Sequence, residues 1–340
     1  MNQVATQTQA VPVALDDTDN AIIALLREDG RAPYRSIAKS LDITEATVRA
    51  RVRRLEDNNT MRVVAVTDIE AAGYDLLLAV GLQVDGRPPE EVARELAAIP
   101  EVFSVNVVVG AQDIEVLVVS ENQAALYQLM TERLARVNGV RRLTPALAVD
   151  VLKNQPDWVP FHAATDTEVE RGFFSPAQGV TGAGVGGRRQ LDATDRGIVE
   201  QLSRDARLSN RHIAAELGVT EGTVRTRIRR MEQERQIRLT AVTNIDRFGD
   251  ASLAYIFVEV ERSDLTRSVA EALAQVNELG FVGVLLGRSD ILGITMVRNT
   301  EHLAAFIHSR ISTIPGVRRT DSTLGVNFIK HDYRMARIVD

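Results

Sequence analysis

The most constraining feature of this 340-residue sequence is an internal repeat, because most of its first half recurs in its second half. The segment Thr44–Arg54 faces Thr220–Arg230 at an offset of 176 positions, and eight of these eleven positions are identical. After one inserted residue the offset becomes 177, where Gly139-Val-Arg-Arg142 faces Gly316-Val-Arg-Arg319. Since a duplicated sequence is expected to fold the same way twice, the chain should contain two copies of one structural unit.

The composition excludes several classes of protein. Cysteine is absent, which excludes disulfides, thiolate metal sites and cysteine nucleophiles, and no two of the five histidines have the spacing of a metal-binding pair. No apolar stretch approaches the roughly 18 residues of a membrane span, and the N-terminus lacks the pattern of a secretory signal. We therefore expect a cytoplasmic protein with no metal, no cofactor and no catalytic residue. The net charge of −6 argues against indiscriminate nucleic-acid binding, but specific binding depends on where the cations lie.

Each copy opens with the pattern of a helix-turn-helix, three short helices with a tight turn before the third. Ile22 and Leu26 follow an Asp/Thr cluster, which predicts a capped amphipathic helix. A second helix is expected over residues 34–41, and the turn after it contains Asp42 in copy one and Gly218 in copy two. Glycine readily adopts the left-handed conformation that suits this turn, and aspartate tolerates it.

The third helix of each unit carries the candidate DNA-binding surface. Val48, Val52 and Leu55 have the spacing of a buried helix face, which turns small residues and arginines outward. Small residues let a helix approach the major groove closely, and arginines pair with guanine edges or phosphates. A solvated arginine face is the alternative, but the recurrence in both copies favours DNA contact. The predicted DNA-binding residues are Thr44, Ala46, Thr47, Arg49, Ala50, Arg53 and Arg54, with Thr220, Gly222, Thr223, Arg225, Thr226, Arg229 and Arg230.

The second part of each unit has strands and helices in the order βαββαβ. The strands are expected at 76–84, 102–109, 114–119 and 140–149, and in copy two at 253–260, 281–286, 291–297 and 317–326. This order is that of the ferredoxin-like fold, so the chain is predicted to be an α+β protein with helices on one face of each sheet. Because the other face is also apolar, each sheet should pair with a second one, giving a pseudo-dimer within the chain and self-association beyond it.

These patterns also give the expected domain boundaries. A tail (1–14), a winged-helix-like helix-turn-helix domain (15–67) and a sensing domain (74–153) are followed by a linker (154–190), a second pair of domains (191–243 and 250–330) and a tail (331–340). The linker is rich in Gly, Ala and Pro in its second half. It contains Gly182-x-Gly184-x-x-Gly187, but without a strand before it or a helix after it, so we reject a dinucleotide-binding interpretation.

The combination of these elements resembles the Lrp/AsnC family of transcriptional regulators. The resemblance rests on a helix-turn-helix followed by βαββαβ, with Gly110-x-x-Asp113 at the middle hairpin and Gly139-Val140 before the last strand. It implies binding of double-stranded DNA and of an amino acid or related effector, near Gly110, Ala111, Gln112 and Asp113, and near Gly287, Arg288, Ser289 and Asp290. The glycines and aspartates also fit a purely structural hairpin, whereas Arg288 has the chemistry to clamp a carboxylate.

Two alternatives from other classes remain open at this point. The tandem architecture also resembles that of the sirohaem decarboxylases, enzymes whose sensing halves hold a tetrapyrrole. The stretch Val102–Val109 is apolar and lacks the histidine that such a site uses, which favours the regulator. A sensing protein that acts on a partner protein is the second alternative, and it would show no salt-sensitive binding to duplex DNA.

Overall fold

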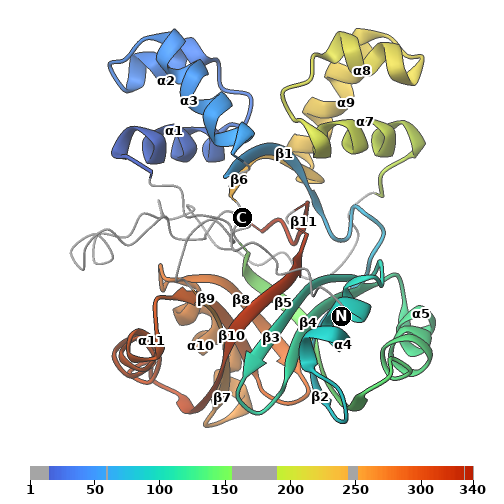
Figure 1. The fold of residues 1–340 in the computed structure, drawn as a ribbon, viewed down its shortest axis with the longest axis vertical. Coiled ribbons are helices and arrows are strands. Elements are labelled where there is room, and N and C mark those ends of the chain that lie inside the picture. The colour runs from blue at the N-terminus through green and yellow to red at the C-terminus, as the bar shows by residue number, and fades with distance from the viewer. Residues whose placement is uncertain (1–14, 59, 155–189, 244–251, 333, 340) are drawn as a thin grey trace, which may run out of the picture.

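The computed structural model describes residues 15–58, 60–154, 190–243, 252–332 and 334–339. Two helix-turn-helix units lie side by side at one end of the molecule, and one barrel built from both copies forms the other end (Figure 1). Most of the expected linker, including its glycine motif, lies outside the described residues. Among the described helices, none combines the length and apolar character needed to cross a membrane.

The helix-turn-helix units form as their capping and apolar patterns predict. Asp16 and Asp192 each begin a first helix with a reciprocal capping box, and Thr44 and Thr220 cap the third helices. The helices are α1 (Asp17–Glu28), α2 (Tyr34–Ser40) and α3 (Glu45–Asp57), repeated as α7 (Ala193–Arg204), α8 (Asn210–Leu217) and α9 (Glu221–Gln233). The turn before the third helix is left-handed in both copies, with φ of 53° at Asp42 and 65° at Gly218, as expected.

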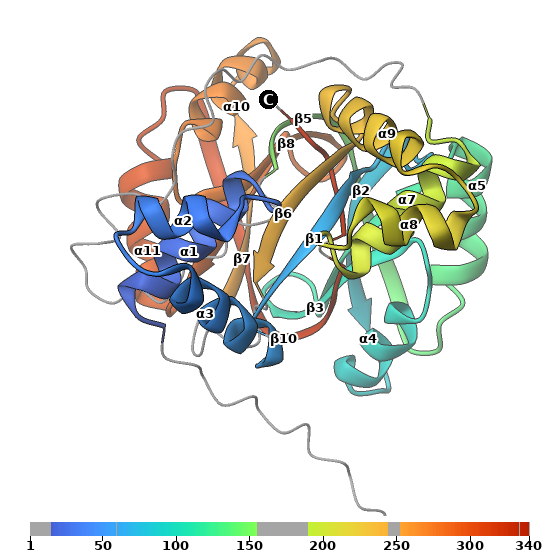
Figure 2. The same cartoon turned by 90° about the horizontal axis from the view of Figure 1, so that it is seen from above.

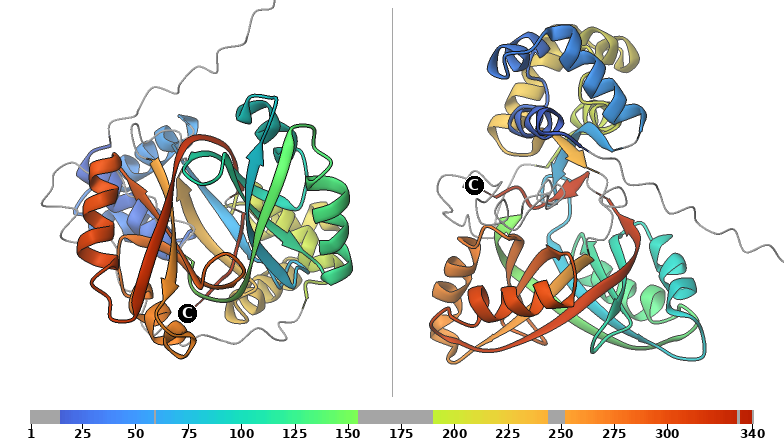
Figure 3. Two further views of the ribbon diagram at one scale, coloured as in Figure 1. Left: turned by 90° about the horizontal axis from the view of Figure 1, so that it is seen from below. Right: turned by 60° about the vertical axis from the view of Figure 1, so that its left-hand side comes forward.

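The two ferredoxin-like halves form one closed barrel of eight strands in the order β10-β3-β4-β2-β5-β8-β9-β7. Copy one supplies β2 (Leu76–Val84), β3 (Val102–Val109), β4 (Ile114–Ser120) and β5 (Val140–Asn154), and copy two supplies β7 (Ser252–Val260), β8 (Leu279–Leu286), β9 (Ile291–Val297) and β10 (Val317–His331). The helices cover the outside (Figure 3); they are α4 (Pro89–Ala97), α5 (Gln123–Gln128) with its π-helical continuation η1 (Leu129–Leu134), η3 (Ser263–Leu265) with α10 (Thr266–Ala274), and α11 (Thr300–Phe306) with the π-helical η4 (Ile307–Ile311).

Long strands close the barrel, and this differs from the stacking of two separate sheets expected from the sequence. Strand β5 extends beyond the expected end at 149 and pairs with β8, from Leu147↔Leu286 to Asn154↔Phe281. Strand β10 extends beyond 326 and pairs in the same way with β3 of the other copy. The physical reason is that a sheet edge carries unpaired N–H and C=O groups, and pairing both edges across the copies satisfies them.

The helix-turn-helix units are cross-braced by two further strands. Strand β1 (Met61–Asp68) pairs antiparallel with β6 (Ile237–Thr243) over seven residue pairs. Each unit also reaches the strand of the other copy, because the Gly30 N–H donates to the Leu239 carbonyl at 3.0 Å and the Ala206 N–H donates to the Val63 carbonyl at 2.9 Å. The two helix-turn-helix units are thus one body that stands above the barrel on β1 and β6 (Figure 3).

The C-terminal residues are not the separate tail expected at 331–340. Strand β10 continues to His331, and β11 (Met335–Ala336) adds to β1 as a parallel third strand. The buried Asp68 carboxylate accepts hydrogen bonds from the Ile338 N–H at 2.8 Å and from Arg337 at 3.2 Å. The end of copy two therefore connects the barrel to β1, the strand that follows the first helix-turn-helix unit.

The close backbone contact at Gly30 gives a stability prediction. A Cβ at this position would lie 2.8 Å from the Leu239 carbonyl carbon and 2.9 Å from the Thr240 nitrogen, both backbone atoms that cannot rotate away. We expect Gly30→Ala to lower the free energy of unfolding by about 1–3 kcal/mol, as overpacking usually does. Denaturant titration would measure this, with Gly222→Ala as the clash-free control, because a Cβ there would have no neighbour nearer than 3.7 Å. Unchanged stability of Gly30→Ala would contradict the close approach.

Candidate nucleic-acid interface

The third helices present the outward face that the sequence predicts. Val48 and Leu55 are fully buried and Val52 is nearly so, whereas Ala46 and Arg53 are exposed. Of the fourteen predicted DNA-binding residues, all are exposed except three, Thr47, Thr223 and Arg230, which are half-buried. Viewed from above, α3 and α9 lie on opposite sides of the β1–β6 ribbon (Figure 2). The outward faces of both third helices, α3 and α9, are therefore open to solvent at the same time.

Several outward arginines make exposed ion pairs within their own helix. Arg49 lies 2.7 Å from Glu45 and Arg225 lies 3.1 Å from Glu221, each one turn away. Arg53 approaches Asp57 at 3.7 Å, and its side chain is 82% exposed. Exposed pairs of this kind contribute little free energy, so these guanidinium groups can exchange their carboxylate for a phosphate or a base edge at small cost.

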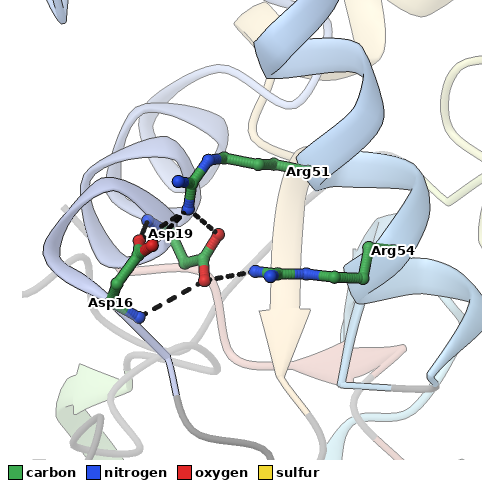
Figure 4. A network of polar contacts seen from close by, with 4 residues as sticks. All are labelled: Asp16, Asp19, Arg51 and Arg54. Carbon is green, nitrogen blue, oxygen red and sulfur yellow. Dashed lines mark hydrogen bonds and ion pairs between the residues drawn. The ribbon is translucent and has the colours of Figure 1, made fainter.

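Other arginines of the same helices hold the unit together (Figure 4). Arg51 donates to Asp16 at 2.6 Å and to Asp19 at 2.8 Å, and Arg54 also binds Asp19, whose side chain is 1% exposed. The same network recurs in copy two, where Arg227 and Arg230 bind Asp192 and Asp195. Arg54 and Arg230, predicted to contact DNA, therefore bind the first helix.

The arginine–aspartate network lowers the pKa of its two N-cap aspartates, Asp16 and Asp192. Hydrogen bonds from Arg227 lower the pKa of Asp192 to about 2, and Arg51 lowers the pKa of Asp16 in the same way. Sequence reasoning missed Arg51 and Arg227 as structural partners. The signal was present, since Asp-x-x-Asp precedes an arginine by the same number of residues in both copies.

The predicted effector residues lie in the two hairpins that join β3 to β4 and β8 to β9. The Asp113 carboxylate accepts a hydrogen bond from the Val84 N–H at 2.8 Å, and Asp290 accepts one from Val260 at 2.8 Å. Gly287 has a φ of 143°, and a Cβ there would lie 2.7 Å from the Pro145 carbonyl oxygen. These glycine and aspartate positions therefore brace the hairpins, as the structural interpretation predicts.

Arg288 clamps a carboxylate, and that carboxylate belongs to the chain itself. Its guanidinium donates to both oxygens of Glu115, at 2.8 and 2.7 Å, and stacks 3.7 Å from the Phe257 ring centroid. Gly81 makes room for it, because a Cβ there would lie 2.4 Å from an Arg288 nitrogen. At the equivalent positions of the other copy stand Ala111 and Leu292, so the duplicated halves differ here.

A tandem pair of helix-turn-helix units joined to one α+β barrel defines the class of protein. A model of the AsnC-type helix-turn-helix domain matches residues 15–56 and 191–232, and the Lrp/AsnC ligand binding domain matches 78–158. A C-terminal dimeric alpha+beta barrel domain matches 250–338. The chain belongs to the Lrp/AsnC family, in a tandem form.

The similar curated proteins correspond to one unit of this chain. An uncharacterised HTH-type transcriptional regulator of Pyrococcus abyssi is 34% identical over 142 residues, which are 42% of this chain and 90% of that protein. The HTH-type transcriptional regulator FL11 of Pyrococcus horikoshii is 35% identical over 115 residues, which are 34% of this chain and 76% of that protein. The sequence similarity therefore supports the family, and the duplication is a property of this chain.

The tandem fold itself resembles a solved structure over nearly its whole length. The siroheme decarboxylase NirDL, in complex with an iron-uroporphyrin III analogue, matches 94% of this chain and 96% of its own chain, with a TM-score of 0.62. The sequence identity is 15%, so the match shows a common fold.

Burial of Glu115 gives a prediction about pH. Burial raises the pKa of this carboxyl from 4.5 to about 7, against the opposing effect of Arg288. Between these values the folded chain binds a proton that the unfolded chain releases, so stability falls as the pH rises through this window. We expect Glu115→Gln to flatten the pH dependence of the unfolding free energy, measured by denaturant titration from pH 5 to pH 7.5. The exposed Glu132→Gln is the control, and an unaltered slope in the Glu115 variant would contradict the assignment.

Proposed function

We propose that this protein is a sequence-specific DNA-binding transcriptional regulator of the Lrp/AsnC type, and that its barrel responds to a small-molecule effector. The observation that carries the proposal is the pair of exposed arginine-bearing helices, α3 and α9, held in one cross-braced body. The chain is acidic overall, with a net charge of −6, so a duplex would be attracted to local groups of exposed arginines such as those of α3 and α9 rather than to the whole surface. Binding at such a surface is specific and sensitive to salt.

The outward residues suit reading of the major groove. We propose that Arg49 and Arg53, with Arg225 and Arg229, contact base edges and phosphates. All four side chains are exposed, and the ion pairs of Arg49, Arg53 and Arg225 are with exposed carboxylates. Small residues at the first turn allow close approach of the helix to the bases. The two helices differ at Ala46/Gly222 and Ala50/Thr226, so the two half-sites are expected to differ in sequence.

The effector is proposed to be an amino acid or related metabolite that binds beside the two hairpins, 110–113 and 287–290. Among the described residues, the buried Oε1 of Gln112 and the buried Oγ of Ser289 make no hydrogen bond. Buried polar atoms without a partner are costly, and a polar ligand would satisfy them. Further self-association of the chain stays a prediction.

An enzymatic function is the second candidate, because the tandem fold matches that of a siroheme decarboxylase. We favour the regulator, since relatives more than 30% identical are named as transcriptional regulators whereas the enzyme is 15% identical. Titration of the purified chain with sirohaem, followed by absorbance, distinguishes the two. Saturable binding at equimolar sirohaem would favour the enzyme.

Removing the outward arginines tests the DNA-binding surface. We expect Arg53→Ala combined with Arg229→Ala to weaken operator binding by more than about tenfold, because each loses a charge-assisted contact. A gel-shift titration at fixed salt, with DNA selected by the wild-type chain from a random pool, measures this.

The matched control removes two arginines from the outside of the barrel. Arg94→Ala combined with Arg136→Ala also removes two positive charges, at exposed positions remote from α3 and α9, and should leave affinity within about twofold. Equal loss in both double variants, or unchanged affinity in the Arg53/Arg229 variant, would refute the assignment.

A further inference from the structure

The two helix-turn-helix units touch each other through a reciprocal pair of arginines, Arg31 and Arg207. These residues are equivalents in the repeat, 176 positions apart, and each lies just after the first helix of its unit. Arg31 donates to the Ala206 carbonyl at 2.7 Å and to the Leu208 carbonyl at 2.9 Å. Arg207 donates to the carbonyls of Gly30 at 2.8 Å and Ala32 at 3.1 Å.

Each arginine also binds a side chain at the start of the opposite second helix. Arg31 donates to the Asn210 side-chain oxygen at 2.9 Å, whereas Arg207 lies 4.3 Å from the ring centroid of Tyr34. Tyr34 and Asn210 occupy equivalent positions, so the two arginines make different contacts there. We call Arg31 and Arg207, with the groups that they bind, the arginine clamp. Arg49 of the reading helix α3 lies over the same Tyr34 ring, at 5.4 Å. The clamp therefore extends to the residues that face DNA.

The chemistry of the clamp makes it rigid. A guanidinium is planar and presents its donors in a fixed fork, so several hydrogen bonds to one loop fix both distance and orientation. Both arginines are half-buried, and burial lowers the pKa of Arg31 without removing its charge at neutral pH. The acceptors are mostly backbone carbonyls, which cannot change rotamer to release the arginine. By contrast, the small sheet of β11, β1 and β6 fixes the angle between the two units less firmly, because the twist between neighbouring strands varies over a wide range.

We propose that Arg31 and Arg207 are positioning residues that hold α3 and α9 at one separation and angle, so that the protein reads two half-sites only at a fixed spacing. This inference rests on the proposed DNA-binding function. Five base pairs rotate one half-site by about half a turn around the duplex, and a rigid pair cannot follow that rotation. A pair joined by the β1–β6 ribbon and the Gly30–Leu239 and Ala206–Val63 hydrogen bonds, without the fork contacts of the two arginines, would follow it in part.

The test compares half-site spacing in the full-length chain. DNA selected by the wild type from a random pool defines the two half-sites, and duplexes with one to five inserted base pairs are then titrated by gel shift. We expect the wild type to lose about tenfold or more in affinity at five inserted base pairs. The Arg31→Ala/Arg207→Ala variant should lose less than about threefold there, with unchanged affinity for a single half-site.

Two further variants separate positioning from general effects. Arg35→Ala with Arg211→Ala removes the same charge at exposed, equivalent positions of α2 and α8, and should keep the wild-type preference for spacing. Arg31→Lys with Arg207→Lys keeps the charge but loses the fork, and it serves if the alanine variant does not fold. We expect it to relax the spacing preference as well.

The outcomes distinguish this inference from the function on which it rests. Relaxed spacing in the clamp variants, with the preference kept in the Arg35/Arg211 variant, supports the proposal. A wild type that binds DNA but accepts every spacing overturns the proposal and leaves the function intact, as does an unrelaxed clamp variant. A wild type that selects no DNA overturns both.

Discussion

The structure depends on hydrogen bonding between strand edges of the two copies. Neither ferredoxin-like half completes its own sheet, because β5 pairs with β8 and β10 pairs with β3 across the repeat. The helix-turn-helix units are also joined by backbone hydrogen bonds between the copies. Strand β1 pairs with β6, and a residue just after each first helix donates to the strand of the other copy. An isolated copy would expose these edges, and exposed edges are sites of further pairing. The duplicated chain therefore folds as one body.

Fusion of two copies in one chain permits differences that a symmetric dimer cannot have. The Arg288–Glu115 pair has Ala111 and Leu292 at the equivalent positions, so the charged pair is built on one side only. In the helix-turn-helix units, Arg207 lies over the Tyr34 ring, whereas the equivalent Arg31 donates a hydrogen bond to Asn210. Both asymmetries lie where the two copies meet. Fusion therefore lets the two helix-turn-helix units, and the two halves of the barrel, differ in the contacts that they make.

Much of the candidate DNA surface was predictable, because it depends on local periodicity. Val48 and Val52 recur at helical spacing and are buried, which sends Arg53 outward whatever the rest of the chain does. The role of Arg54 was not predictable from that pattern. It lies at the flank of the helix and binds Asp19, and only the packing of α3 against α1 brings these two residues together.

The amino-acid sequence alone determined the duplication, the helix-turn-helix with its left-handed turn, and the order of strands and helices. The helix-turn-helix and the order of elements depend on residues close together along the chain, and the duplication is found by comparing two segments of the sequence directly. Only the tertiary structure decided how the copies join: the closure of the barrel, the addition of β11 to β1, and the Arg31–Arg207 clamp. Each of these contacts uses backbone groups more than one hundred residues from their partners, paired with other backbone groups in the sheets and with guanidinium groups in the clamp. Backbone groups are the same in every residue, so a sequence pattern carries no record of which of them will meet.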